Sequence, residues 1–67
     1  MRIIQSVTGF YTAMRYTIVQ FDDGVFGWQY SYGLDTITKD EFLSVTEAIQ
    51  DIEHREIMLS HGMTVMV

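Results

Sequence analysis

Residues 14–32 constrain the fold of this chain more than any other stretch, because they form a β-hairpin pattern whose register can be read from the sequence. Two runs of alternating side chains flank Asp22–Gly24, and Asp-Asp-Gly is typical of a type I turn followed by a glycine in the left-handed region. A three-residue loop of this kind places Phe21 opposite Val25. The hairpin therefore has one predicted register, and every other cross-strand pair follows from it.

That register divides the hairpin side chains between two faces of a sheet. One face is rich in aromatic rings and stacks the pairs Met14/Tyr32, Tyr16/Tyr30, Ile18/Trp28 and Gln20/Phe26. The other face is mostly polar and carries Arg15, Thr17, Val19, Gly27, Gln29 and Ser31. A two-residue Asp-Gly turn would pair Ile18 with Gln29 and mix the two faces, so we reject it.

A third strand is predicted before the hairpin. The β-branched run Arg2–Thr8 ends at Gly9, where the chain turns back toward a hairpin strand that begins near Ala13. With one helix packed on the aromatic face and a short C-terminal strand, Met63–Val67, the predicted fold class is α+β with the element order βββαβ. An alternative pairs Ile57–Leu59 with the C-terminal segment as a second hairpin and shortens the helix to about three turns.

The start of the helix is ambiguous. Residues 34–38 lead into the helical stretch, where two capping boxes compete: Thr38-x-x-Glu41 and Ser44-x-x-Glu47. The second box would begin the helix at Val45 and leave Phe42 in an extended segment. The first would align one apolar stripe toward the sheet, formed by Phe42, Val45, Ala48, Ile49, Ile52 and Leu59.

Length and composition favour one small domain over residues 1–67. The absence of cysteine means that neither disulfides nor thiolate metal sites support its core. Apolar residues make up 48% of the chain, which is enough for it to fold. No apolar run reaches the roughly 20 residues of a membrane span, and the N-terminus lacks a signal-peptide pattern, so we expect a cytoplasmic protein without membrane contact.

The net charge is unevenly distributed along the chain. The formal charge of −5 belongs entirely to residues 35–67, because two arginines and two aspartates cancel in residues 1–34. Binding to a nucleic-acid backbone needs a basic patch, which this composition does not favour. We therefore expect a protein partner with a basic surface and no direct contact with nucleic acid.

No residue pattern predicts catalysis or a cofactor. The glycines are dispersed and not gathered in a phosphate-binding loop. Each has a local reason: turns are expected at Gly9, Gly24 and Gly33, a bulge at Gly27 and a helix cap at Gly62. The available catalytic trio would be Ser60, His61 and a carboxylate, and a chain this short has little volume for a cleft. We expect no enzyme and no cofactor.

Glu47, Asp51 and His54 share one helix face at i, i+4 and i+7, a spacing that lets a carboxylate and an imidazole meet one metal ion. A complete site of this type needs ligands from several helices, and this chain offers one. We interpret the face as solvated and acidic, opposite the apolar stripe. Asp51 and Arg55 then form an i, i+4 ion pair, and no metal is expected.

Two further surfaces could contact a partner. The aromatic sheet face lacks the interleaved basic residues of a base-stacking surface, so we assign it to the core. A row of Asp40, Glu47 and Asp51 on one strip of the helix would resemble the phosphate spacing of DNA, which makes a DNA mimic one hypothesis. The predicted partner-binding residues are Asp40, Glu47, Asp51, Phe10 and Tyr11.

No motif identifies a family. A small acidic chain without a catalytic constellation, a phosphate loop or a basic patch is most simply a protein-binding module. Small acidic proteins of this kind include bacteriophage and mobile-element products that bind and block a larger host protein, among them anti-defence inhibitors, and this is the function we expect. The alternative is a self-assembling structural or accessory subunit, in which the uncharged strand Met63–Val67 pairs with a second copy.

Overall fold

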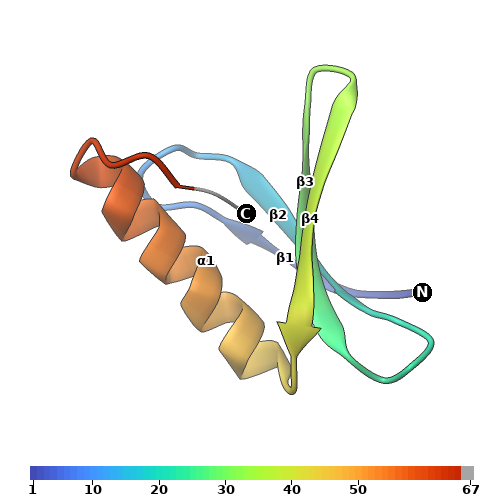
Figure 1. Cartoon of the computed structure of the whole chain (residues 1–67). Coiled ribbons are helices and arrows are strands. Elements are labelled where there is room, and N and C mark those ends of the chain that lie inside the picture. The colour runs from blue at the N-terminus through green and yellow to red at the C-terminus, as the bar shows by residue number, and fades with distance from the viewer. Residues whose placement is uncertain (66–67) are drawn as a thin grey trace.

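In the computed structural model, which describes residues 1–65, four antiparallel strands form one sheet and a single helix packs on one of its faces (Figure 1). The elements are β1 (Arg2–Thr8), β2 (Arg15–Gln20), β3 (Phe26–Tyr32), β4 (Asp35–Phe42) and α1 (Val45–Ser60). Each strand pairs with the next along the chain, so the sheet order is β1-β2-β3-β4. The predicted α+β class, with one helix on an antiparallel sheet, is confirmed.

The hairpin of β2 and β3 has the predicted register. Ile18 lies opposite Trp28, and in the connecting loop the Phe21 N–H donates a hydrogen bond to the Val25 carbonyl at 2.8 Å. Gly24 has a φ of +88°, which is the left-handed conformation that the Asp-Asp-Gly loop predicts. The local turn chemistry therefore fixes which side chains face the core.

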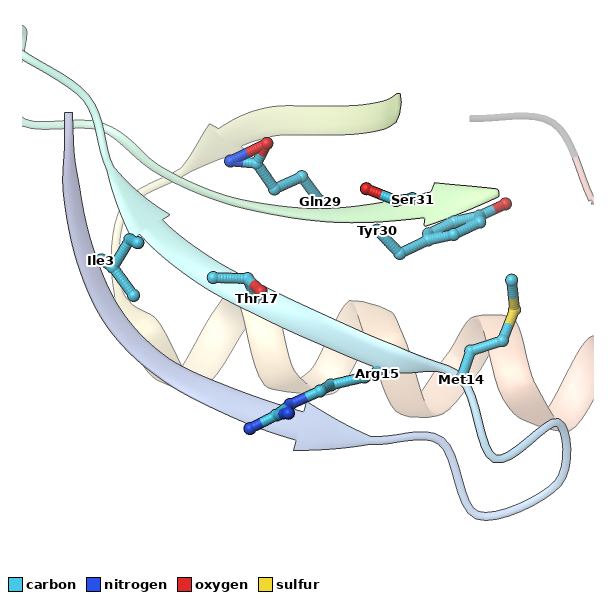
Figure 2. Close-up of a pocket in the computed structure, with 7 residues that line it drawn as sticks. All are labelled: Ile3, Met14, Arg15, Thr17, Gln29, Tyr30 and Ser31. Carbon is cyan, nitrogen blue, oxygen red and sulfur yellow. The ribbon is translucent and has the colours of Figure 1, made fainter. Parts of the chain in front are cut away.

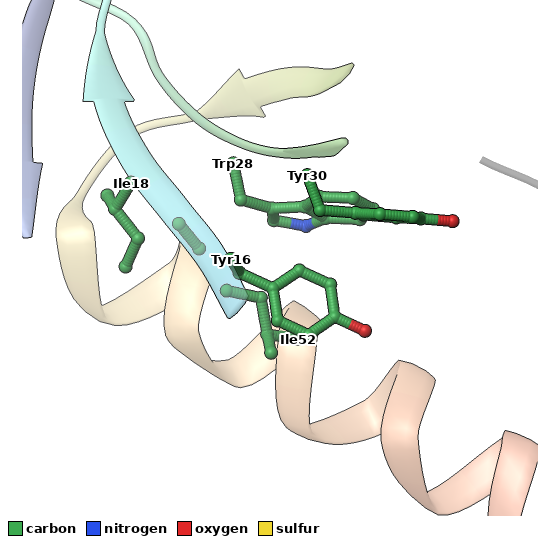
Figure 3. Close-up of a cluster of buried hydrophobic side chains, with 6 residues drawn as sticks. Tyr16, Ile18, Trp28, Tyr30 and Ile52 are labelled. Carbon is green, nitrogen blue, oxygen red and sulfur yellow. The ribbon is translucent and has the colours of Figure 1, made fainter. Parts of the chain in front are cut away.

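The aromatic face of this hairpin forms the core, as predicted (Figure 3). The Tyr16 ring meets the Trp28 ring edge-on with centroids 5.4 Å apart, and the Trp28 and Tyr30 rings stack with centroids at 6.0 Å. Ala48 and Ile52 of α1 pack in the same cluster. Burial of such rings and aliphatic side chains is the main favourable term for a domain of this size, at about 25 cal/mol per Å² of apolar surface.

Strand β4 replaces the predicted lead into the helix. Gly33, at a φ of +62°, allows a tight turn after β3, and Ile37 then lies opposite Tyr30 on the core face. The prediction for residues 34–38 was wrong because Thr38-x-x-Glu41 has the chemistry of a helix start, whereas pairing with β3 holds this segment in a strand. Within residues 1–65 the element order is therefore ββββα, where the sequence predicted βββα followed by a short C-terminal strand.

The helix begins at the second of the two competing capping boxes. Ser44 is the N-cap, in an extended conformation with a φ of −152°, and its hydroxyl accepts a hydrogen bond from the Glu47 N–H at 3.2 Å. The Glu47 carboxylate reaches back to the Leu43 N–H at 2.6 Å, so two backbone donors near the helix start are satisfied. Phe42 accordingly ends β4 and packs on the core from the strand.

Gly62 ends the helix in the predicted way. Its φ of +74° permits a Schellman motif, in which the Gly62 N–H donates to the Leu59 carbonyl at 3.0 Å and the Met63 N–H donates to the Met58 carbonyl at 3.1 Å. Within residues 1–65, α1 is the one helix, and its 16 residues are too few and too polar to cross a membrane.

Two predictions for the C-terminal part of the chain are wrong. Residues 57–59 are helical and cannot form the strand of a second hairpin. The predicted strand Met63–Val67 is not formed in its described part, residues 63–65, where the Schellman motif directs the chain out of the helix. Met66 and Val67 lie outside the described residues.

The cap of α1 generates a stability prediction. Replacing Ser44 by alanine removes the acceptor of the Glu47 N–H and should lower the free energy of unfolding by about 1 kcal/mol. Urea denaturation followed by far-ultraviolet circular dichroism measures the change. Thr46→Ala is the control, because Thr46 is exposed in the same helical turn. A loss for Ser44→Ala no larger than that for Thr46→Ala would contradict the role of the cap.

Candidate protein-binding surface

Two exposed aromatic rings lie on the loop that joins β1 to β2. We call residues 9–14 the aromatic loop, and its Phe10 and Tyr11 are 66% and 57% exposed. Aromatic side chains are enriched at the buried centres of protein interfaces, because each ring contributes a large apolar area. Both residues belong to the predicted partner-binding set, and the remainder of the loop explains how they are held.

The backbone of the aromatic loop folds tightly. The Gly9 N–H donates to the Met14 carbonyl at 2.7 Å, and the Ala13 N–H donates to the Gly9 carbonyl at 3.0 Å. Ala13 has a φ of +61°, an uncommon conformation for a residue with a side chain. Gly9 lies against Glu56 of α1, and a Cβ atom on residue 9 would overlap that carboxylate. The absence of a side chain at residue 9 therefore lets the loop touch the helix.

The carboxylate of Glu56 holds the aromatic loop from the helix side. Glu56 is 0% exposed and accepts hydrogen bonds from four donor groups. Three belong to the loop: the Tyr11 N–H at 3.1 Å, the Thr12 N–H at 2.8 Å and the Thr12 hydroxyl at 2.8 Å. The fourth is the hydroxyl of Tyr16 in β2, at 2.8 Å. A buried carboxylate needs several donors to offset the water that it has lost.

These donors keep Glu56 ionised. Burial alone would raise its pKa, but the hydrogen bonds from Thr12, Tyr16 and Tyr11 outweigh burial and hold the pKa of Glu56 below its ordinary value of 4.5. Burial, and then the hydrogen bond to Glu56, raise the pKa of Tyr16 to about 12. At neutral pH the pair is therefore a neutral phenol that donates to a carboxylate.

Asp51 faces the sheet, which contradicts the prediction that it lies on the solvated face of the helix. Its carboxylate accepts a hydrogen bond from Nε1 of Trp28 at 2.8 Å and from Nζ of Lys39 at 3.0 Å. The indole N–H of a buried tryptophan needs an acceptor, and this requirement turns Asp51 inward. Lys39, and not Arg55, is the ion-pair partner of Asp51.

Arg55 is directed into the aromatic core and is only 9% exposed. Its Nη2 donates to the Tyr30 hydroxyl at 2.7 Å. The guanidinium carbon lies 5.5 Å from the centre of the Trp28 ring and 5.2 Å from that of Tyr30, distances at which a cation is attracted to an aromatic face. Arg55 and Glu56 follow Ile52 by three and four positions, the spacing at which a wholly apolar stripe would have continued along the helix.

Asp40 and Glu47 lie near the opposite end of α1 from the aromatic loop. Asp40 is exposed on β4, and Glu47 is exposed in the first turn of the helix. Glu47 is nine residues from Glu56, which corresponds to about 14 Å along a helix. The predicted partner-binding residues therefore form two separate groups, with Asp51 engaged between them. Because Asp40 is on a strand, the row on one helix strip that a DNA mimic requires is not formed.

The carboxylates of Glu47 and Asp51, which share the predicted helix face with His54, have other partners. Glu47 accepts the Leu43 N–H, and Asp51 accepts the indole N–H of Trp28. Within the part of the chain that the structure describes, no three His, Asp or Glu side chains are grouped closely enough to hold a metal ion.

An open groove of about 480 Å³ is lined mainly by side chains on the sheet face away from α1, and it reaches Met14 and Tyr30 at the margin of the core (Figure 2). Thr17 and Arg15 line it from β2, and Gln29 and Ser31 line it from β3. These side chains belong to the predicted polar face, because they alternate along each strand with the rings of the core. The groove offers hydroxyl, amide and guanidinium groups, which suit hydrogen bonding more than nucleophilic chemistry.

The roles of Thr12, Arg55 and Glu56 were not predicted. The available signal was helical phase, because residues 55 and 56 follow Ile52 by three and four positions, the spacing of the buried stripe. Charged residues at these positions indicate either that the apolar stripe has ended or that the charges are buried and paired. Which of the two holds depends on partners from the sheet and the aromatic loop, which are distant in sequence.

Comparisons with known proteins do not assign the chain to a class. It matches no protein-family model, no curated protein and no solved structure. What the chain does must be inferred from the aromatic loop and from the contacts that hold it.

The lowered pKa of Glu56 predicts how stability depends on pH. Below about pH 4.5 the unfolded chain binds more protons than the folded protein, so the free energy of unfolding should fall as the pH drops through this range. Glu56→Gln should cost about 1–3 kcal/mol at neutral pH, because it removes charge-assisted hydrogen bonds, and it should flatten the dependence on acid pH.

Urea denaturation at a series of pH values, from neutral down to about pH 3, measures both effects. Glu53→Gln is the matched control, because Glu53 is exposed on the same helix. We expect the control to follow the wild type. The same loss of stability with acid in wild type and Glu56→Gln would show that Glu56 is not the group responsible.

Proposed function

We propose that this chain is a protein-binding module that presents its aromatic loop to a larger protein. The observation that carries the proposal is the buried Glu56 carboxylate, which fixes the backbone beside the exposed Phe10 and Tyr11 rings. A loop held in one conformation loses little entropy on binding, so the apolar area of its rings is available for affinity. Aromatic residues are also among those that most often dominate the binding free energy of interfaces.

The distribution of charge supports a basic partner. Glu56 is buried and Asp51 is paired with Lys39, so neither contributes to a free acidic surface. The other acidic residues of the second half are exposed: Asp35, Asp40, Glu41, Glu47 and Glu53. Such a surface speeds the encounter with a basic protein and makes the rate sensitive to salt. A small rigid domain docked in this way covers part of its partner, so inhibition of a larger host protein is the activity that we propose.

Self-assembly is the second candidate, and the sheet edge favours it. β1 is an edge strand, and residues 3–8 within it carry no charge. β4 lies at the opposite edge of the sheet. Its charged side chains, and the positive φ of +88° at Glu41, disfavour pairing with a strand of a second copy. A second copy would therefore pair along β1 and not through the predicted strand Met63–Val67.

Capture from a bacterial lysate tests the binding proposal. The tagged wild type, the double variant Phe10→Ala/Tyr11→Ala and the control Tyr32→Ala are compared, and bound proteins are identified by mass spectrometry. Tyr32 is a matched control because it is 71% exposed but lies outside the aromatic loop. We expect one stoichiometric protein that the wild type and the control retain, and that the double variant binds at least about tenfold more weakly.

Circular dichroism of the double variant verifies that it is folded, and a high-salt wash tests the role of charge. Equal retention of the captured protein by the folded double variant would refute the aromatic loop as the binding surface. Recovery of copies of the chain alone would favour self-assembly. In that case a charge introduced in the middle of β1, Ser6→Lys, should abolish the association.

A further inference from the structure

A small cavity lies between α1, the sheet and the segment that follows the helix. Its volume is about 160 Å³, and its wall includes Trp28, Lys39, Asp51, Arg55 and Thr64. Two of the four Lys and Arg residues of the chain meet in this wall, although the net charge of the chain is −5. None of these wall residues belongs to the aromatic loop, so the role proposed for that loop does not account for this concentration of positive charge.

Arg55 is the polar group of the wall that is least satisfied. Its Nη2 donates to the Tyr30 hydroxyl. Its Nε and Nη1 are buried, and within residues 1–65 neither has a hydrogen-bond partner. A buried charged donor without an acceptor is costly, and native structures usually supply an acceptor to such a group. The guanidinium therefore has capacity for an additional acceptor.

The charges around the cavity leave a positive excess. Among residues 1–65, Asp51 is the one carboxylate in the wall, and it already accepts hydrogen bonds from Trp28 and Lys39. Glu56 follows Arg55 in the sequence, but its carboxylate is directed to the aromatic loop and to the Tyr16 hydroxyl in β2. In this part of the chain, one carboxylate thus faces the guanidinium of Arg55 and the ammonium of Lys39.

We propose that this cavity binds a small oxyanion, a carboxylate or a phosphate group, through Arg55 and Lys39. A guanidinium presents planar donors that match the oxygens of both groups, and an ammonium keeps free donors beside the one that it gives to Asp51. Thr64 also lines the cavity, and threonine carries a hydroxyl that can donate a hydrogen bond. A metal cation would meet two like charges, and an apolar ligand would leave the donors unpaired, so neither fits this chemistry.

Titration with inorganic phosphate and with sodium acetate, followed by NMR of the wild-type protein, tests this proposal. The reporters are the Nε–H resonance of Arg55 and the indole N–H resonance of Trp28, the single tryptophan of the chain. Sodium chloride at equal ionic strength is the salt control. We expect a saturable shift with at least one oxyanion, and the anion that saturates at the lower concentration identifies the preferred chemistry.

Lys39→Met and Arg55→Lys are the test variants, followed at the Trp28 indole. Arg15→Gln is the control, because it removes one positive charge from the open groove on the other sheet face. Each test variant should weaken binding about tenfold or more, whereas the control should bind like the wild type. If Arg55→Lys does not fold, Lys39→Met decides alone. A shift no larger than that with chloride, or one that Lys39→Met leaves unchanged, would overturn the proposal.

Discussion

Three aromatic side chains carry a polar atom into the core, and each of these atoms is paired with a charged side chain of α1. The rings contribute apolar area, which has no preferred direction, whereas hydrogen bonds are directional and costly to leave unmade when buried. A helix displaced by one turn would separate all three pairs, so these contacts fix the position of α1 on the sheet. The pairs are Trp28 with Asp51, Tyr30 with Arg55 and Tyr16 with Glu56, at 2.8, 2.7 and 2.8 Å.

Glu56 extends this constraint from the core to the surface. The carboxylate that accepts the Tyr16 hydroxyl also accepts the N–H groups of Tyr11 and Thr12 in the aromatic loop. Gly9 belongs to the same arrangement, because the carboxylate occupies the space that a side chain there would need. A loop that exposes aromatic rings can in this way keep an ordered backbone, and in the function that we propose this order lowers the entropy cost of binding.

The parts of the fold that depend on neighbours in sequence could be predicted, and the parts that depend on distant partners could not. The turn at Asp22–Gly24 determined the hairpin register, and Gly62 marked the helix end. β4 was not predicted, because its charged residues are compatible with a helix start as well as with a strand. Pairing with β3 determines that this segment is a strand. The role of Glu56 could not be read from the sequence, because its donors lie 40 to 45 residues away. Phe10 and Tyr11 were predicted as partner-binding residues, whereas the group that orders their backbone was not predicted.

Hydrogen exchange at the amides of Tyr11 and Thr12 tests most directly whether the buried Glu56 carboxylate fixes the aromatic loop. Both N–H groups donate to Glu56 from a surface loop, so slow exchange there requires that contact. We predict that both amides are protected in the wild type and lose about tenfold or more of that protection in Glu56→Gln, relative to the amides of β2. Exchange of both amides in the wild type at the rate of an unstructured peptide would contradict the claim.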